Sequence, residues 1–396
     1  MSFDADIIVV GAGPAGLGFC RTLAQSPVSI IVLEKQVQKQ IAEPQFDGRE
    51  IALTHASRQS MQQLGIWDHL PADNVYPLKD AKVVDGTSDY QLHFEDKKPR
   101  IPGEGLGFLV PNYLIRQASY NAIKNQANLE IRYGLGVKDV LLSATGVKVI
   151  LEDGSTLTAR LVIAADSRFS STRRHMGIGA DMNDFGRTVH VFRMRHTISN
   201  EHTALECFHY GNTLAILPLE ENLSSCVVTI DTNRSHEITD LNPDQLAQRI
   251  MNELNHKLGD MTLEGEIVSY PLVGVHAKHF YGLSCAVIGD AAVGMHPVTA
   301  QGYNLGLQSA MLLGGLIAEA SSKGQDIAAP SLLAKYERQH MLNTRPIYHG
   351  TNFVVGLFTT ENVPAKLLRS AVLRISNNFP PIKMAITHLL TRLNKA

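Results

Sequence analysis

The residues that decide the fold are Asp6–Glu34, which read DIIVV GAGPAG LGFCRTLAQSPVS IIVLE. The run at 6–10 is rich in β-branched residues and predicts a short buried strand. Apolar residues at helical spacing over 15–24 predict a helix, and residues 28–33 predict a second buried strand. A strand, a helix and a strand in this order form a βαβ unit, which implies a parallel sheet. The sequence therefore predicts an α/β fold.

The turn between the first strand and the helix has the pattern GxGxxG. Gly11 allows the tight turn, Gly13 lets the backbone approach a pyrophosphate, and Gly16 permits close packing of helix on strand. The helix begins at Pro14 and Ala15, so its free N–H groups and positive dipole end face the phosphates. This turn predicts a dinucleotide site.

An acidic residue ends the second strand. Glu34 can accept hydrogen bonds from a ribose 2′-hydroxyl, and a carboxylate there disfavours a 2′-phosphate. We include the neighbouring Lys35 in the same site. The bound nucleotide is therefore expected to be FAD or NAD rather than NADP.

A second group of residues lies near position 290. Gly289 and Asp290 follow a short buried strand at 286–288, and residues 296–306 lead into an apolar helix over 301–319. A carboxylate at a strand end can bind the ribityl hydroxyls of a flavin, and the start of the helix can offer N–H groups to the flavin. A loop with a capping aspartate explains the same residues equally well.

At this point the chain resembles the FAD-dependent aromatic hydroxylases of the p-hydroxybenzoate hydroxylase type. It is most similar to the ubiquinone-biosynthesis hydroxylases among them. The resemblance covers nearly the whole chain and is carried by the GxGxxG with Glu34, GREIAL at 48–53 with LGIW at 64–67, Ala165-Asp166 to Arg173, LPL at 217–219, and residues 289–306. The chain departs from the family pattern at Ser167, Val293 and Ala300.

The resemblance implies roles for further residues. Arg49 would contact FAD near the pyrophosphate, Arg116 would help to bind its phosphates, and Val137 would lie beside the adenine through its backbone. Asp166 would shape the FAD site and is linked in the family to the use of nicotinamide nucleotides. The residues implied around the ribityl chain and the flavin ring are Gly289, Asp290, Pro297, Gln301, Gly302, Tyr303 and Asn304.

The reaction implied by the resemblance is hydroxylation of the aromatic ring of a ubiquinone precursor or a related phenol. A flavin C4a-hydroperoxide formed from O₂ would attack the ring, with NAD(P)H as a transient electron donor. No metal is implied and no catalytic side chain is assigned. Two alternatives stay open: another flavin reaction, such as prenyl-lipid reduction or dehydrogenation, and a non-catalytic FAD- and quinone-binding component of a biosynthetic complex.

The strand and helix patterns divide the chain into three regions. A Rossmann-like FAD-binding domain is assembled from the discontinuous segments 1–70, 103–182 and 270–350. A strand-rich substrate domain, formed by 71–102 and 183–269, is inserted between them, and 351–396 form a C-terminal helical segment.

Composition limits the partners. A formal net charge of −2 over 396 residues argues against nucleic acid as a partner. The N-terminus lacks the features of a signal peptide, and no apolar run is long enough to span a bilayer, so we expect a cytoplasmic protein. Residues 363–375 form a basic amphipathic pattern, and no acidic residue follows Glu361. This pattern suits either peripheral binding to a membrane or a terminal helix docked on the core.

Overall fold

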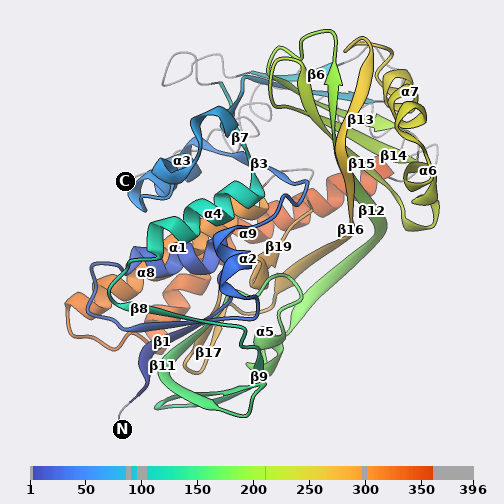
Figure 1. Ribbon diagram of the computed structural model, residues 1–396. Coiled ribbons are helices and arrows are strands. Elements are labelled where there is room, and N and C mark those ends of the chain that lie inside the picture. The colour runs from blue at the N-terminus through green and yellow to red at the C-terminus, as the bar shows by residue number, and fades with distance from the viewer. Residues whose placement is uncertain (1–2, 86–90, 96–104, 210, 297–300, 360–396) are drawn as a thin grey trace.

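The computed structural model describes residues 3–85, 91–95, 105–209, 211–296 and 301–359. The predicted βαβ unit is confirmed as β1 (Ala5–Val10), α1 (Pro14–Thr22) and β2 (Ile30–Glu34). β1 and β2 pair in parallel, with Ile7 opposite Ile30 and Val10 opposite Leu33. The α/β fold class is therefore confirmed (Figure 1).

The first sheet is built around this unit. Its strands follow the order β18–β11–β1–β2–β8, all parallel, with antiparallel strands at one edge and on β11. The added strands are β8 (Leu129–Tyr133), β9 (Val137–Ser143), β10 (Gly146–Leu151), β11 (Thr156–Ala164), β17 (Tyr281–Gly282) and β18 (Cys285–Val287). β2 lies on one side of β1 and β11 on the other, so the strand order reverses direction at β1. In open α/β sheets, ligands bind outside the carboxyl ends of the strands at such a point.

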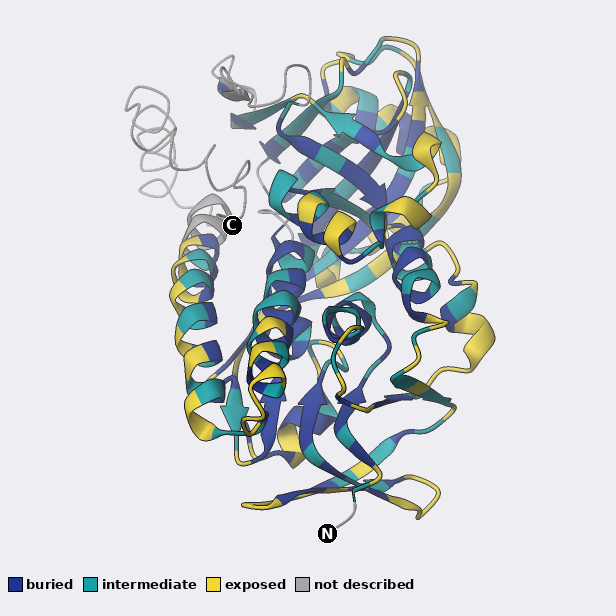
Figure 2. Cartoon of the chain, turned by 90° about the vertical axis from the view of Figure 1, so that its left-hand side faces the viewer, coloured by how far each residue is buried: buried dark blue, intermediate teal, exposed yellow. Residues whose placement is uncertain are grey.

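Helices cover this sheet and bury its central strands, as Figure 2 shows. They are α1, α2 (Gln38–Ala42), α4 (Asn112–Ile123), α5 (Ser171–His175), α8 (Gly302–Ser322) and α9 (Pro330–Thr359). α1 and α8 pack closely: a Cβ atom on Gly314 would lie 1.8 Å from the Thr22 hydroxyl. The predicted helix over 301–319 is present and continues to Ser322. The last residues of α9 are the only described part of the predicted C-terminal segment, because 360–396 lie outside the described residues.

A small antiparallel sheet lies beside the first one. It consists of β3 (Glu50–Leu53), β7 (Gly107–Pro111) and β4 (Tyr76–Leu78), and it is followed or flanked by α3 (His55–Gln63) and the short helices η1 (Trp67–His69) and η2 (Ala72–Asn74).

The third sheet is the strand-rich part of the molecule. Its order is β19–β16–β12–β15–β14–β13–β5–β6. The strands are β5 (Asp80–Asp85), β6 (Gln91–Glu95), β12 (Ala180–His196), β13 (Thr203–His209), β14 (Asn212–Pro218), β15 (Leu223–Asp231), β16 (Met261–Ala277) and β19 (Val293–Gly294), with η3 (Thr232–Arg234), α6 (His236–Thr239) and α7 (Pro243–Glu253).

The two faces of this third sheet have different neighbours. On the outer face, Phe192, Cys226 and Val228 pack with Leu246 and Ile250 of α7. We call the opposite side, which carries Val191, Arg193, Ala215 and Leu217, the inner face. It turns toward the FAD-binding part: Leu217 packs with Ala52 and Leu109, and Arg193 pairs with Glu50.

Two strands of the third sheet, β12 and β16, are 17 residues long and extend from this sheet toward the first sheet (Figure 1). The boundaries expected near 182 and 270 fall inside these strands, so the division into domains stays a prediction.

Candidate FAD site

The glycine turn leaves no room for side chains at two of its three glycines. Gly11 has φ +108°, and a Cβ atom there would lie 2.6 Å from the Ala165 carbonyl oxygen. A Cβ atom on Gly16 would lie 2.1 Å from the Gly11 oxygen. Around Gly13, by contrast, nothing lies within 4 Å. The turn therefore has one open side, at the start of α1, where a pyrophosphate can approach the backbone.

Glu34 lies directly behind this turn. Its carboxylate accepts hydrogen bonds from the backbone N–H of Ala12 at 2.7 Å and of Gln36 at 2.8 Å. These two bonds hold the half-buried carboxylate close to the turn. Lys35 points away into solvent, where it forms an ion pair of 3.6 Å with Glu152, and both side chains are more than half exposed.

The structure brings the second motif to the same place. A Cβ atom on Gly289 would lie 2.7 Å from the Cβ atom of Ala15, at the start of α1. Asp290 is the central residue of η4 (Gly289–Ala291) and is about one-third exposed. The carboxyl ends of β1, β11 and β18 thus gather the glycine turn, Asp166 and Asp290 around one region.

Two arginines near Asp290 were missed by the sequence analysis. Arg168 donates to the Asp290 carboxylate at 3.2 Å and to the Val273 carbonyl at 3.0 Å. Arg173 is 1% exposed and donates to the carbonyl of Ala291 at 2.8 Å, which holds η4 in place. Burial lowers the pKa of Arg173, while nearby Asp166 opposes that shift.

Asp166 acts on its own loop. Its carboxylate accepts hydrogen bonds from the Ser170 hydroxyl and from the Thr172 backbone N–H. Ser167, the residue after Asp166, has φ +78°, a left-handed conformation that glycine adopts more easily than serine. The Asp166 bonds therefore hold a loop whose backbone is unfavourable for the residue found there.

The other residues assigned through the resemblance lie along one flank. Arg49 forms an ion pair with Asp47 at 2.5 Å, and Asp47 also accepts from Asn112 at 2.6 Å. Arg116 donates to the side chain of Gln36 at 3.1 Å, next to Glu34 in the chain. Val137 begins β9 and is half-buried. Arg49 and Arg116 keep exposed surface, so both can reach an anion.

The start of α8 carries the flavin-ring candidates. Gln301 precedes Gly302, the first residue of the helix, and nothing lies within 4 Å of a Cβ atom built on Gly302. The Asn304 side chain accepts from the Thr54 backbone N–H at 3.2 Å and donates to the Ala52 carbonyl at 2.9 Å. Pro297 lies outside the described residues. Burial raises the pKa of Tyr303, so its phenol is neutral.

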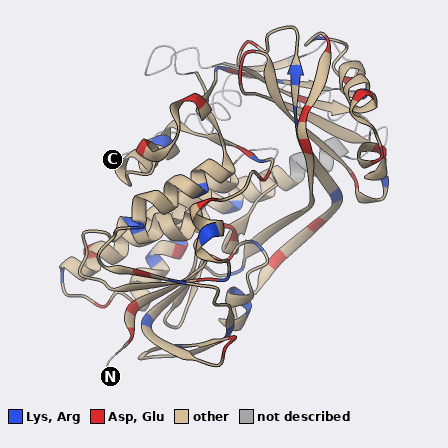
Figure 3. Ribbon diagram, viewed as in Figure 1, with Lys and Arg blue, Asp and Glu red and all other residues tan. Residues whose placement is uncertain are grey.

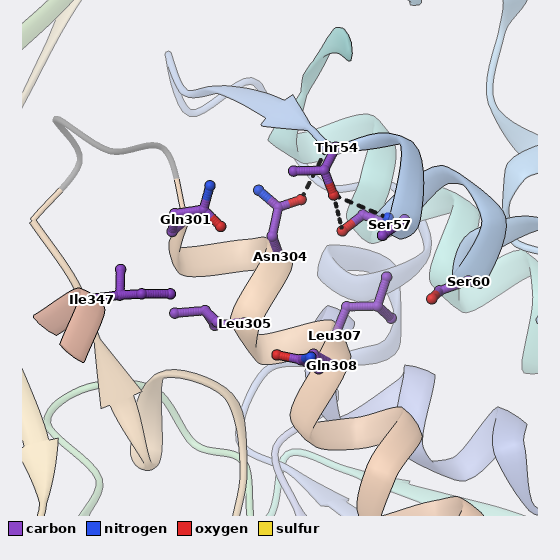
Figure 4. Close-up of a pocket in the computed structure, with 10 residues that line it drawn as sticks. Thr54, Ser57, Ser60, Gln301, Asn304, Leu305, Leu307, Gln308 and Ile347 are labelled. Carbon is purple, nitrogen blue, oxygen red and sulfur yellow. Dashed lines mark hydrogen bonds between the residues drawn. The ribbon is translucent and has the colours of Figure 1, made fainter. Parts of the chain in front are cut away.

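Figure 4 shows a pocket between α3 and α8, with Asn304 directed at Thr54 across it. Its lining residues are Thr54, Ala56, Ser57, Ser60, Gln301, Asn304, Leu305, Leu307, Gln308 and Ile347. The hydrogen bonds of Asn304 tie the start of α8 to β3, which fixes the helix terminus relative to the segment that contains Arg49.

His296 is buried beside this region. Its ring lies edge-on to Phe185 with centroids 5.0 Å apart. Burial, helped by the positive charge of Arg187, lowers its pKa to about 4. His296 is therefore neutral at pH 7 and packs as an uncharged ring against Phe185.

These residues fit FAD. The open side at Gly13, the carboxylate behind the turn and the second carboxylate at Asp290 match a dinucleotide whose far half carries polyhydroxyl groups. Within the described residues, no cluster of side chains suits a metal ion. The arrangement is that of a flavin-binding protein.

Comparisons with known proteins agree. A family model described as "FAD binding domain" matches residues 4–345. Ubiquinone hydroxylase UbiM of Neisseria meningitidis is 54% identical over 393 residues, which cover 99% of this chain and 85% of that protein. Ubiquinone hydroxylase UbiL of Rhodospirillum rubrum is 32% identical over 96% of this chain and 87% of that protein.

Among solved structures, p-nitrophenol 4-monooxygenase PnpA of Pseudomonas putida superposes with a TM-score of 0.77 at 15% identity, covering all of both chains. This likeness confirms the fold. The chain belongs to the FAD-binding family and, within it, to the ubiquinone-biosynthesis hydroxylases, and it is an FAD-dependent monooxygenase.

Proposed function

We propose that this protein hydroxylates the aromatic ring of a prenylated ubiquinone precursor. The reaction takes up O₂ and NAD(P)H with one proton, places one oxygen atom on the ring, and releases water and the oxidised nicotinamide. The single observation that carries the proposal is a glycine turn open to a pyrophosphate at Gly13, in a chain 54% identical to a ubiquinone hydroxylase.

The protein's share of this chemistry is binding and orientation. FAD supplies the activation of oxygen when it is bound. Gly11, Gly13 and Gly16 would admit its pyrophosphate, Glu34 its adenosine ribose, and Asp290 its ribityl chain. Asn304 would set the position of the flavin ring through its bonds to the segment at β3. The apolar inner face would exclude water from the reacting ring.

The test is product analysis with the purified FAD-loaded protein. A prenylated phenol precursor, NAD(P)H and O₂ should yield a product heavier by one oxygen atom, which mass spectrometry detects and ¹⁸O₂ labels. Deletion of the gene should cause the unhydroxylated precursor to accumulate. Substrate turnover without O₂ uptake would instead identify a reductase or dehydrogenase. Binding of quinone without substrate-stimulated oxidation of NAD(P)H would identify a non-catalytic component.

We further propose that the chain after Glu361 docks the enzyme on an anionic membrane, where a prenylated substrate resides. Within the described residues, no helix is long and apolar enough to cross a bilayer. The sequence after Glu361 contains six basic residues and no acidic one, namely Lys366, Arg369, Arg374, Lys383, Arg392 and Lys395. Each basic residue near an anionic surface contributes about 1 kcal/mol, so attachment would be reversible and salt-dependent.

Deleting residues 363–396 should therefore lower co-sedimentation with vesicles that contain phosphatidylglycerol. It should also reduce turnover of long-tailed substrates more than that of short phenols. A full-length variant with Lys366, Arg369 and Arg374 changed to glutamine is the matched control for loss of length. It should bind vesicles less than the unchanged chain does and retain FAD. Equal sedimentation of all three proteins would show that the segment is a packing element.

A further inference from the structure

A carboxyl group without a hydrogen-bond partner lies on the inner face of the third sheet. The register places five residues beside one another across the strands, in the order Val191, Val227, Ala215, Glu206 and Val83. Four of these residues are apolar, and only Glu206 is charged. The row crosses the middle of the sheet on the side opposite α7.

No described group offsets the charge of Glu206. The neighbouring positions on the same face are Ala204 and Phe208 on β13, Thr213 and Leu217 on β14, and Ala81 and Asp85 on β5. Of these only Asp85, which is opposite Phe208 in the register, is charged, and its charge has the same sign as that of Glu206. Glu206 forms no hydrogen bond and no ion pair within the part of the chain that the structure describes, and desolvation alone raises its pKa, to about 8. The residue is nevertheless only half-buried.

The contrast with Glu50 is informative. Glu50 reaches the same inner face from β3, but its carboxylate is paired with Arg193 at 2.6 Å. Arg193 also lies over the ring of Phe46, with 4.6 Å between the guanidinium carbon and the ring centroid. A cation is therefore available on this face, but Glu50 uses it and Glu206 does not. An unpaired carboxylate in apolar surroundings is costly, so such a residue is expected to serve a ligand.

We propose that Glu206 is a catalytic residue whose carboxylate binds a ring hydroxyl of the aromatic substrate and accepts its proton. This inference rests on the proposed function. The apolar neighbours of Glu206 suit the flat faces of an aromatic ring. Within the row of five residues, the carboxylate of Glu206 is the group that can accept a hydrogen bond from the ring's hydroxyl.

The proton transfer breaks the O–H bond of the substrate and forms an O–H bond on Glu206. The electron pair stays on the substrate oxygen, which raises the electron density of the ring carbons ortho and para to it. After oxygen insertion, the ring regains aromaticity by losing the proton of the attacked carbon to solvent. Glu206 then returns its proton to the ring oxygen, and both groups recover their starting states.

A group whose pKa lies near the working pH is suited to this transfer. The base must be ionised, so kcat/KM should rise as the pH passes through about 8. The stability of the protein without ligand should change in the opposite sense. Because the folded state binds the Glu206 proton more tightly than the unfolded chain, stability should fall as pH rises from the ordinary range of a glutamate to about 8.

The experiment compares Glu206→Gln and Glu206→Asp with the unchanged enzyme and with Glu266→Gln, an exposed glutamate on β16. In Glu206→Gln we expect unchanged FAD content, a fall in kcat of about 100-fold, in the range of general base catalysis, and loss of the rise of kcat/KM with pH. Glu206→Asp should recover part of the rate and the pH dependence. Glu266→Gln should behave as the unchanged enzyme.

A second measurement separates this role from a structural one. The unfolding midpoint of Glu206→Gln at pH 9 should equal or exceed that of the unchanged protein, because an unpaired charge has been removed. A lower midpoint with a parallel loss of FAD would overturn the assignment. So would a rate and pH profile equal to those of the unchanged enzyme.

Binding to the oxidised, FAD-loaded protein distinguishes a failure of this inference from a failure of the proposed function. A short-chain alkylphenol should show the ultraviolet absorption of the phenolate when bound to the unchanged protein and to Glu266→Gln, but not when bound to Glu206→Gln. If the unchanged enzyme forms no hydroxylated product but still ionises the phenol, the proposed function fails and Glu206 keeps its role. If product forms and the phenol is ionised equally in Glu206→Gln, the inference about Glu206 is wrong.

Discussion

Replacing Gly16 by alanine is expected to unfold the start of α1 and abolish FAD binding. The new Cβ atom would lie 2.1 Å from the carbonyl oxygen of Gly11, and both atoms belong to rigid parts of the turn. Neither can move without separating the helix from β1. Overpacking of this kind costs about 3 kcal/mol or more, which is a large part of the stability of a domain.

Gly13→Ala is the matched comparison, because it adds the same methyl group three residues away. Nothing lies within 4 Å of that position, and Gly13 has φ −76°, which alanine adopts freely. The free energy of unfolding of the FAD-free protein should therefore change by less than about 0.5 kcal/mol. FAD affinity should still fall, by about 100-fold, because the methyl group occupies the space through which the pyrophosphate reaches the backbone.

Denaturant unfolding followed by circular dichroism measures the stability of both variants without FAD. Flavin fluorescence, measured after heat release, gives their FAD content. The expected pattern is loss of stability only in Gly16→Ala and loss of FAD in both. Full FAD retention in Gly13→Ala would contradict the placement of the pyrophosphate at the start of α1.

Asp290→Ala should weaken FAD binding by one to two orders of magnitude. Its carboxylate is about one-third exposed at the carboxyl end of the parallel sheet and would accept one or two hydrogen bonds from the ribityl chain. Each bond to a charged group contributes about 1.5 to 3 kcal/mol, and about 1.4 kcal/mol corresponds to a tenfold change in affinity. Titration of the FAD-free protein with FAD, followed by quenching of flavin fluorescence, measures the change.

Arg168→Met is the control for the ion pair that Asp290 forms in the protein itself. Methionine keeps the Cβ atom of Arg168 beside Gly294 and removes the cation together with its hydrogen bond to the Val273 carbonyl. Both partners of the pair are a quarter to a third exposed, so its own contribution is small and FAD affinity should change only a few-fold. If Arg168→Met lost as much affinity as Asp290→Ala, Asp290 would act through Arg168 and not by contact with the cofactor.

The sequence was sufficient wherever function depends on local geometry. The spacing of Gly11, Gly13 and Gly16 between two β-branched strands predicted the turn, because only a tight strand-to-helix connection requires glycine at those positions. Glu34 could be assigned for the same reason, since the end of the second strand in a βαβ unit lies next to the first turn. The strand end and helix start on either side of Asp290 were also predicted from neighbours in the chain, and its contact with the ribityl chain stays a prediction.

Residues whose importance comes from distant partners could not be found this way. Arg168 reaches Asp290 across 122 positions of the chain, and Arg193 reaches Glu50 across 143. Arg168 follows a strand and Arg193 lies within one, and in neither case do the neighbouring residues in the sequence indicate the partner of the arginine. Only the pairing of β11 with β18, and the approach of β12 to β3, brings these charges together.

Glu206 shows the division most clearly. Successive residues of a strand point to opposite faces, so Glu206 and Cys207 of β13 lie on different faces. The sequence does not say which face is covered by a helix and which faces the FAD-binding part. The sequence by itself determined the FAD-binding turn, because that turn is made by neighbours in the chain. Only the tertiary structure decided that Glu206 lies on the inner face. The two faces of the sheet differ because α7 packs on one of them, whereas β3 and β7 approach the other.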